Sequence, residues 1–598
     1  MKTPIIITNL LLFTLMMLKN ANAQNSSNIN FEISFTEPQA HYVDVQMTID
    51  NISTKSVTIK MPVWAPGSYL VREFSKNVES LQVADSKGKP LSFEKTAKNS
   101  WKINSLNTKK IVVNYRVYAF EVSVRTSFVD ADQAFLSPPD VFMYVDGQLA
   151  QSATVKILPR QGWGKISTAL TNLTNQSHTF YAANFDQLFD SPIEVGNQDV
   201  FYFDAAGVKH EVAMVKGGNY DAEKLKVDMA KIVEAETAIF GENPNKRYVF
   251  IIHNYASGGG GLEHESSTVL GAKRTGYTDE ATYKDFLSLV AHEYFHLWNV
   301  KRLRPKALGP FDYDKENYTT NLWVAEGFTA YYENLICKRT GIITEEDYLT
   351  ELAKNINTIA NQPGNKVQSV SDASFNAWIK YYRPNENSSN SSVSYYNKGA
   401  LVASVIDLAI IQNSQGKYSL DDAMKFAYGE YYKKLKRGYT DAEFRIVLEK
   451  FAGKPLKFIY DNYINGTADI DFSTYLGFAG LKVVDTNVGV NTAYLGANTA
   501  LINDRLIIRS VARNSAAYLS GLNVNDIILS IDGTKPDNLS KFIAEKKPAD
   551  ILKFVVDRDG IEKTIDVKLK ANPNKNFVIH KMEEMTDLQK IILNKWLR

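Results

Sequence analysis

Alternating apolar and polar positions dominate the first third of the chain. Such stretches cover Tyr42–Ile49, Val57–Met61, Lys110–Val117 and Ala153–Leu158, and turn residues separate them. A period of two residues is typical of β-strands with one buried face. The pattern therefore predicts an all-β domain over residues 24–200, either a sandwich or a broad antiparallel sheet.

The pattern changes in the middle of the chain. Arg247–Ile252 is a short apolar run that predicts a strand, and apolar positions at helical spacing dominate after Ala281. Thr440 and Glu443 have the spacing of a capping box, which predicts the start of a helix. Residues 201–472 are thus predicted to form a second domain that is β at its start and helical afterwards.

One helical segment of this domain carries a possible metal site. His292, Glu293 and His296 form an HEYFH run within an apolar-periodic stretch. One helical turn separates the two histidines, so both imidazoles lie on one face and can hold a zinc ion. Glu293 then lies beside the ion, where a carboxylate can take a proton from activated water. The alternative is a helix with two surface histidines.

A catalytic zinc ion takes three protein ligands and keeps a fourth position open. The segment 321–332 is predicted to form a second helix, and Glu326 stands there among apolar neighbours. An unpaired carboxylate would be costly to bury in such surroundings, so Glu326 is the candidate third ligand. Glu333, in the same helix, is predicted to be a solvated surface residue.

Two further segments contain candidate substrate-binding groups. Gly258–Gly261 let the backbone approach another chain closely, the residues that follow have strand character, and Glu263 is able to bind a free amino group. A flexible surface loop is the alternative. Tyr396 precedes an apolar helix, and its hydroxyl is a potential donor to an oxyanion, although a plain helix start has the same pattern. A polar segment, residues 383–392, precedes this tyrosine and is predicted to be a mobile loop.

Together these blocks resemble the gluzincin metallopeptidases, and within them the glycyl aminopeptidase family, M61. His292–Pro305 is similar to the zinc helix of that family and its basic continuation, and Met61–Leu70 is similar to a signature of its N-terminal β domain. The resemblance covers most of the mature chain. It implies a multidomain α+β protein with an N-terminal all-β domain, a thermolysin-like gluzincin catalytic domain and a C-terminal PDZ domain.

The resemblance also implies roles for individual residues. The implied ligands of one Zn²⁺ per chain are His292, His296 and Glu326. Glu293 is similar to the general base of the family. Tyr396, or its neighbour Tyr395, is similar to the tyrosine that steadies the tetrahedral intermediate.

The glycine-rich segment resembles the GxMEN element of related aminopeptidases, in which the glutamate binds the N-terminal amine of the substrate. Gly260, Gly261, Leu262 and Glu263 occupy this element here. Leucine replaces the methionine of the pattern and His264 replaces its asparagine. The resemblance therefore assigns substrate binding to these four residues, with Glu263 as the amine-binding group.

The last part of the chain resembles a PDZ domain, which we place at residues 473–572. The resemblance rests on Leu506–Val511 and Asp526–Gly533, and Tyr475–Phe478 is similar to a carboxylate-binding loop. PDZ domains bind peptide C-termini by adding a strand to a sheet edge. The alternative is a peptide site that is vestigial or serves only as a lid. Residues 573–598 are predicted to be a tail that ends in a short helix.

These observations favour a zinc metallopeptidase that acts on peptides, and specifically an aminopeptidase that releases small N-terminal residues such as glycine or alanine. One alternative is a secreted zinc endopeptidase with substrate choice guided by the PDZ domain. Another is a non-enzymatic peptide-binding scaffold with a structural zinc, although such a site does not require Glu293.

The first 23 residues have the features of a secretory signal peptide: Lys2, an apolar core and Ala21–Ala23 before the predicted cleavage site. We therefore expect an exported protein, periplasmic or extracellular, without a transmembrane segment in the mature chain. The single cysteine, Cys337, excludes an internal disulfide. A net charge of +2 with interspersed signs does not suggest nucleic acid as a partner.

Overall fold

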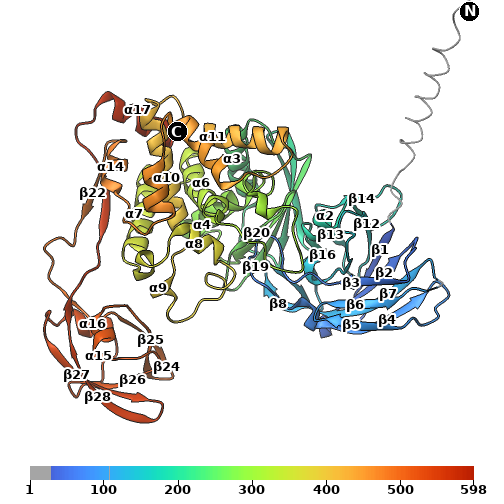
Figure 1. The fold of residues 1–598 in the computed structure, drawn as a ribbon, viewed down its shortest axis with the longest axis horizontal. Coiled ribbons are helices and arrows are strands. Elements are labelled where there is room, and N and C mark those ends of the chain that lie inside the picture. The colour runs from blue at the N-terminus through green and yellow to red at the C-terminus, as the bar shows by residue number, and fades with distance from the viewer. Residues whose placement is uncertain (1–27, 107) are drawn as a thin grey trace, which may run out of the picture.

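The computed structural model describes residues 28–106 and 108–598, so the predicted signal peptide, residues 1–23, lies outside the described part. A β-rich N-terminal domain, a mostly helical central domain and a small C-terminal β domain follow one another along the molecule (Figure 1). Within the described ranges, no helix combines the length and apolar character needed to cross a membrane. The predicted multidomain α+β architecture is confirmed.

The N-terminal domain is built from three sheets around its own apolar core. The first has the order β14 (Thr171–Asn172), β15 (Thr179–Ala182), β12 (Ala153–Leu158), β1 (Ile29–Ser34), β2 (Tyr42–Ile49), β7 (Ile111–Tyr118) and β4 (Val78–Asp85). The second has the order β11 (Tyr144–Val145), β3 (Ser56–Lys60), β6 (Ser100–Asn104) and β5 (Phe93–Ala97). The third has the order β13 (Lys165–Thr168), β16 (Ile193–Gly196), β10 (Ala134–Leu136), β9 (Thr126–Val129) and β8 (Phe120–Ser123).

The alternating sequence pattern explains these sheets. Along β2, Val43, Val45 and Met47 are buried while the residues between them are more exposed, as a period of two requires. The predicted all-β domain is therefore confirmed, and β2 and β12 have the predicted bounds.

A mixed five-stranded sheet opens the central domain. Its order is β17 (Asp199–Ala205), β18 (Val208–Val215), β19 (Arg247–Tyr255), β21 (Ser267–Lys273) and β20 (Gly261–Glu263). β18 and β19 are parallel and are connected through helix α3 (Ala222–Phe240), whereas β20 runs antiparallel to β21 at the edge. The residues after the glycines, predicted to have strand character, form the internal strand β21, and β20 forms the edge of the sheet.

Helices form the remainder of the central domain and share one large core with the sheet. They are α4 (Glu280–Phe295), α5 (Leu322–Ala325), α6 (Gly327–Arg339), α7 (Glu345–Ala360), α8 (Val370–Phe375), α9 (Ser388–Ser391), α10 (Asn397–Asn413), α11 (Leu420–Ala427), α12 (Asp441–Ala452), α13 (Lys457–Ile459) and α14 (Phe472–Gly477). The predicted capping box of Thr440 and Glu443 opens α12. The segment predicted as one helix over 321–332 is two helices that meet at Glu326.

The C-terminal domain has a five-stranded sheet and its own core. Its strands are β24 (Ala497–Ile502), β25 (Arg505–Val511), β26 (Ile527–Ile531), β27 (Ile551–Arg558) and β28 (Ile561–Lys568), with β23 (Ala493–Tyr494) paired to β29 (Lys570–Ala571) and helices α15 (Ala516–Ser520) and α16 (Leu539–Ala544) beside them. Tyr475–Phe478, predicted as its carboxylate-binding loop, lies instead in and just after α14 and packs on the central core. The domain therefore begins about twenty residues after the predicted boundary at 473.

The chain returns from this domain to the central one. β22 (Leu481–Asp485) and β30 (Phe577–Lys581) pair as a two-stranded sheet, and α17 (Asp587–Leu597) follows (Figure 1). Trp596 of α17 is fully buried and its indole nitrogen donates to the Tyr331 hydroxyl at 2.7 Å. Residues 573–598 are thus part of the central domain, which corrects their prediction as a tail.

The polar segment before Tyr396 forms α9 rather than only a loop. The side-chain nitrogen of Asn390 donates to the Val511 carbonyl at 2.8 Å, and its side-chain oxygen accepts from the Arg513 backbone amide at 2.8 Å. Asn390 itself is buried. The segment predicted to be a mobile loop is therefore held by hydrogen bonds between the central domain and the C-terminal β domain.

Candidate active site

The two histidines and the distant glutamate converge at the end of α4. His292 lies in the last turn of α4, His296 directly follows the helix, and Glu326 lies at the junction of α5 and α6. The two histidine Nε2 atoms are 3.2 Å apart, and Oε2 of Glu326 lies 3.6 Å from the first and 3.3 Å from the second. All three side chains are buried.

The outer nitrogens of both imidazoles have acceptors. Nδ1 of His292 lies 2.6 Å from a carboxylate oxygen of Glu333, and Nδ1 of His296 lies 3.1 Å from the Asn299 carbonyl. Both Nδ1 atoms therefore carry the hydrogen, and both Nε2 atoms present lone pairs to each other and to a carboxylate. Glu333 was predicted to be a solvated surface residue, and its contact with His292 corrects that prediction.

With both imidazoles neutral, the three facing acceptors share no hydrogen, and a cation satisfies all of them. Zinc bonds of about 2.0–2.1 Å in a tetrahedron place neighbouring donor atoms about 3.3–3.4 Å apart. The three observed separations of 3.2, 3.3 and 3.6 Å match this spacing. The residues present thus fit a zinc ion.

Glu293 points into the space beside these ligands. It is buried, and its Oε2 has no hydrogen-bond partner among the described residues. A Cβ atom on Gly261 would lie 2.1 Å from Oε1 of Glu293, so the carboxylate fills the space that glycine leaves. Burial raises the pKa of Glu293 to about 7.

Glu263 supplies a third carboxylate at this centre, after Glu326 and Glu293. Ligand atoms of Glu263, Glu293 and His296 lie within 4.8 Å of one another, and Oε1 of Glu263 has no partner within the described residues. Gly261, Leu262 and Glu263 form the edge strand β20, and Gly260 directly precedes it. The structure thus brings the glycine-rich element to the metal triad.

The N-terminal domain contributes a wall that the sequence pattern did not reveal. Gly67 has a φ of +86°, and a Cβ atom there would lie 2.5 Å from Oε1 of Glu263. Trp64 and Tyr69, on either side of this glycine, are buried in the core of the central domain. Arg125, from the turn between β8 and β9, also donates to the Gly261 carbonyl at 3.1 Å.

The histidine that departs from the GxMEN pattern has a structural partner. Nδ1 of His264 lies 2.9 Å from Oδ1 of Asp190, just after helix α2 (Phe185–Phe189) of the N-terminal domain. The Lys301 ammonium bonds the same oxygen at 2.8 Å, and the Glu265 amide donates to the other oxygen. His264 therefore fixes the end of β20 against the N-terminal domain.

Tyr396 and Tyr395 differ in their position at the centre. The Tyr396 ring lies 6.2 Å from the ring of His292, centroid to centroid, and both residues line a cleft of about 390 Å³. Tyr395 is fully buried beneath it. A Cβ atom on Gly327 would lie 2.5 Å from the Gly399 Cα, which shows how closely α6 and α10 approach and why Tyr396 reaches the metal ligands.

A second groove lies where the C-terminal β domain meets the central domain. Leu495 and Gly496, directly before strand β24, line it together with α16. Asn361 and Pro363 of the central domain lie on its other side. β24 is an edge strand of its sheet, so this groove has the geometry for peptide addition.

The fold and the site together define the chain as a multidomain metallopeptidase. Comparison with protein families specifies the relationship. Residues 30–197 match the Peptidase M61 N-terminal domain, residues 285–402 match M61 glycyl aminopeptidase, and residues 493–569 match a PDZ domain. Two M61 family models thus match separate parts of this chain, which confirms the resemblance seen in the sequence.

Solved structures add a full-length relative. A crystal structure of an aminopeptidase N family protein from Idiomarina loihiensis is 29% identical, covers 95% of this chain and 100% of its own, and gives a TM-score of 0.89. An M1 zinc metallopeptidase from Deinococcus radiodurans is 13% identical, with coverage of 72% and 91% and a TM-score of 0.45. The latter similarity is too low to support any assignment. No curated protein sequence gives a significant match.

Proposed function

We propose that this protein is a zinc-dependent aminopeptidase that releases small N-terminal residues from peptides. The observation that carries the proposal is the convergence of three metal-ligating atoms with two further buried carboxylates, Glu293 and Glu263. One carboxylate suffices for proton transfer. The second, without a partner within the described residues, is suited to a cationic amine.

Each residue at the centre has its own role in the proposed hydrolysis. Zinc held by His292, His296 and Glu326 would supply a Lewis acid that polarises the scissile carbonyl and activates water. Glu293 accepts the proton of the attacking water and passes it to the leaving amine. Burial raises the pKa of Tyr396 well above its ordinary value, so its hydroxyl keeps its proton and donates to the developing oxyanion.

Glu263 restricts cleavage to the first peptide bond. Its carboxylate pairs with the free α-amine, and β20 offers the edge of a sheet to the rest of an extended peptide. Gly260, Gly261 and Leu262 keep the backbone of this element close to the substrate. The preference for glycine or alanine rests on the family match.

A panel of aminoacyl arylamides, assayed with and without a chelator, tests the proposal. We expect the highest kcat/KM for glycine or alanine, loss of activity on chelation and recovery with Zn²⁺. N-acetylated peptides should resist hydrolysis. Equal cleavage of acetylated peptides would indicate an endopeptidase, and stoichiometric zinc without any hydrolysis would indicate a scaffold with a structural metal.

We also propose that the protein is exported and acts outside the cytoplasm, which rests on the features of residues 1–23. Mass spectrometry of the protein from cell fractions tests this, with a mature chain that begins at Gln24 as the expected result. Recovery of the full-length chain from the cytoplasmic fraction alone would contradict it.

A further inference from the structure

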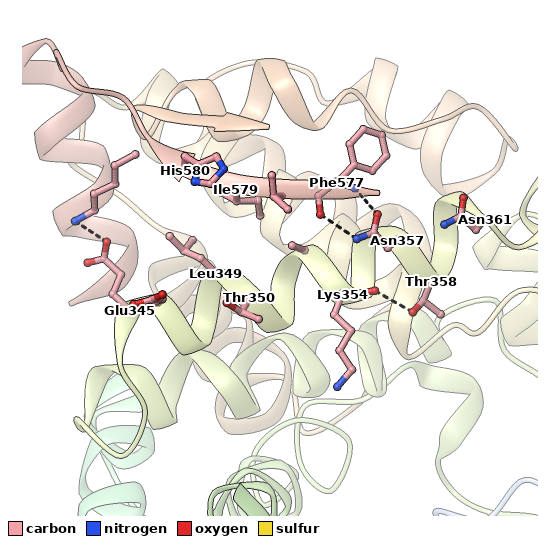
Figure 2. Close-up of a pocket in the computed structure, with 14 residues that line it drawn as sticks. Glu345, Leu349, Thr350, Lys354, Asn357, Thr358, Asn361, Phe577, Ile579 and His580 are labelled. Atoms are coloured by element: carbon pink, nitrogen blue, oxygen red, sulfur yellow. Dashed lines mark hydrogen bonds and ion pairs between the residues drawn. The ribbon is translucent and has the colours of Figure 1, made fainter. Parts of the chain in front are cut away.

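A groove outside the catalytic centre lies between α7 and β30 (Figure 2). It has a volume of about 1070 Å³. An ion pair between Lys581 and Glu345, at 2.6 Å, closes one end. Leu349, Thr350 and Ala353 of α7 face the strand across the groove. The space thus runs parallel to an edge of the β22–β30 sheet.

The pairing of β22 and β30 determines which backbone groups face the groove. The Thr486 amide donates to the Asn576 carbonyl, and the Met582 amide donates to the Gly480 carbonyl. Residues with even numbers from 576 to 582 therefore direct their backbone groups to β22. Residues 577, 579 and 581 direct theirs to the opposite edge, towards the groove.

Two asparagine side chains, one in α7 and one at its C-terminal end, form hydrogen bonds with the backbone at the beginning of this edge. The side-chain nitrogen of Asn357 donates to the Phe577 carbonyl at 2.9 Å, and its side-chain oxygen accepts from the Phe577 backbone amide at 2.7 Å. Asn361, one helical turn later, does the same with Lys575 at 2.9 and 2.8 Å. Figure 2 shows Asn357 directly against Phe577. Each side-chain amide thus takes the place of a peptide group of a neighbouring strand.

The pairing stops after Asn357. The next residues on this face of α7 are Ala353, Thr350 and Leu349, and among the described residues none provides a hydrogen bond to the backbone of Ile579. The amide and carbonyl of Ile579 therefore face a groove with an apolar floor. The backbone carbonyl and amide of an extended peptide can pair with this amide and this carbonyl.

We propose that the groove binds an extended segment of a peptide substrate as a third strand on β30, far from the scissile bond. This inference rests on the proposed peptidase function. The cleft that contains His292 and Tyr396 extends to Lys354 and Thr358 of α7, and these two residues also line the groove. A peptide that leaves the catalytic centre through the cleft therefore reaches the groove by crossing one helix.

The distance sets the class of substrate. Crossing a helix of about 10–12 Å diameter takes roughly three or four extended residues at about 3.3 Å each. With the cleft and the groove included, only peptides longer than about ten residues occupy both sites. The residue that pairs with Ile579 needs its own backbone amide, which excludes proline there.

The test compares a peptide of about fifteen residues with the aminoacyl arylamide of the same first residue. Ile579→Pro removes the amide that faces the groove without removing a bond to β22, and Thr350→Trp fills the groove from an exposed position. We expect both variants to raise KM for the long peptide about fivefold or more while kcat/KM for the arylamide stays within about twofold. The control is Ile446→Trp, at an exposed position of α12.

Binding of the fluorescein-labelled long peptide to Glu293→Gln, measured by anisotropy, separates the groove from catalysis. If Ile579→Pro or Thr350→Trp, introduced into Glu293→Gln, weakens binding of the long peptide, the groove is a peptide-binding site. This result holds even if the protein shows no peptidase activity. Unchanged KM and unchanged anisotropy in both variants would overturn the inference. Circular dichroism identifies a misfolded variant, in which case the other variant decides.

Discussion

At the residue scale, Glu333 forms a hydrogen bond to His292 and so positions a proposed metal ligand without being one itself. The carboxylate holds the proton on Nδ1, which leaves Nε2 free to bind the proposed zinc ion. We predict that Glu333→Gln lowers zinc affinity about 10- to 100-fold, measured by competition with a chelator of known affinity. Glu351→Gln is the control, because Glu351 lines the same cleft but pairs with Lys354. Equal affinity in both variants would contradict the assigned role.

Gly67 allows a second test at this scale. In Gly67→Ala the new methyl group collides with the carboxylate of Glu263, which must move away from the amine-binding position. We predict a rise in KM for arylamides of about tenfold or more, because a hydrogen-bonded ion pair to the amine is weakened. Gly88→Ala is the matched control. Its φ of +78° gives similar backbone strain, but nothing lies within 4 Å of the added Cβ atom. A similar KM in both variants would exclude the collision as the cause.

At the element scale, α2 and β20 are linked through Asp190, which joins the N-terminal domain to the glycine-rich strand. Burial alone would raise the pKa of Asp190, but Lys301 and His264 hold it below its ordinary value. A lowered pKa in the folded state gives a contribution to stability that is complete well above the ordinary Asp pKa of about 3.9. This contribution is lost as the pH falls below that value.

We therefore predict that Asp190→Asn destabilises the protein near neutral pH by about 3 kcal/mol, because Lys301 stays buried without its partner. The loss relative to wild type should shrink as the pH falls below about 4. Denaturant unfolding at several pH values measures both. Asp132→Asn, at an exposed carboxylate, is the control. A pH-independent difference would show that the ionised carboxylate is not responsible.

The same elements show what the sequence predicts and what it misses. The spacing of His292 and His296 is a local property of a helix, and Glu326 is distinguished by its apolar neighbours, so the sequence alone is enough to predict all three as candidate ligands. The contacts of Gly67 with Glu263 and of Asp190 with His264 join positions far apart in the sequence. No local periodicity encodes them. The role of Glu333 depends on which face of α6 meets α4, which a helical pattern alone leaves open.

At the scale of the whole molecule, the C-terminal helix α17 returns from the C-terminal β domain and packs in the core of the central domain. Its helix begins with a capping box of Thr586 and Gln589, and its buried residues 592, 593, 596 and 597 follow a helical period. These signals are present in the sequence, but they do not tell which surface the helix covers. The structure shows that it covers α6, the helix that follows Glu326, while the C-terminal β domain keeps its own core.

The burial of Trp596 makes this closure testable. Its indole nitrogen donates to the Tyr331 hydroxyl, which in turn donates to Asp407 at 2.6 Å. We predict that Trp596→Ala destabilises the central domain by about 3–5 kcal/mol, since it leaves a cavity and an incomplete buried hydrogen-bond chain. Calorimetry should show a lower Tm for the transition of that domain only, because the C-terminal β domain has a separate core. Asn594→Ala, at an exposed position of the same helix, should leave both transitions within about 0.5 kcal/mol of wild type. If Trp596→Ala behaves like this control, α17 is an appendage and the central domain is complete without it.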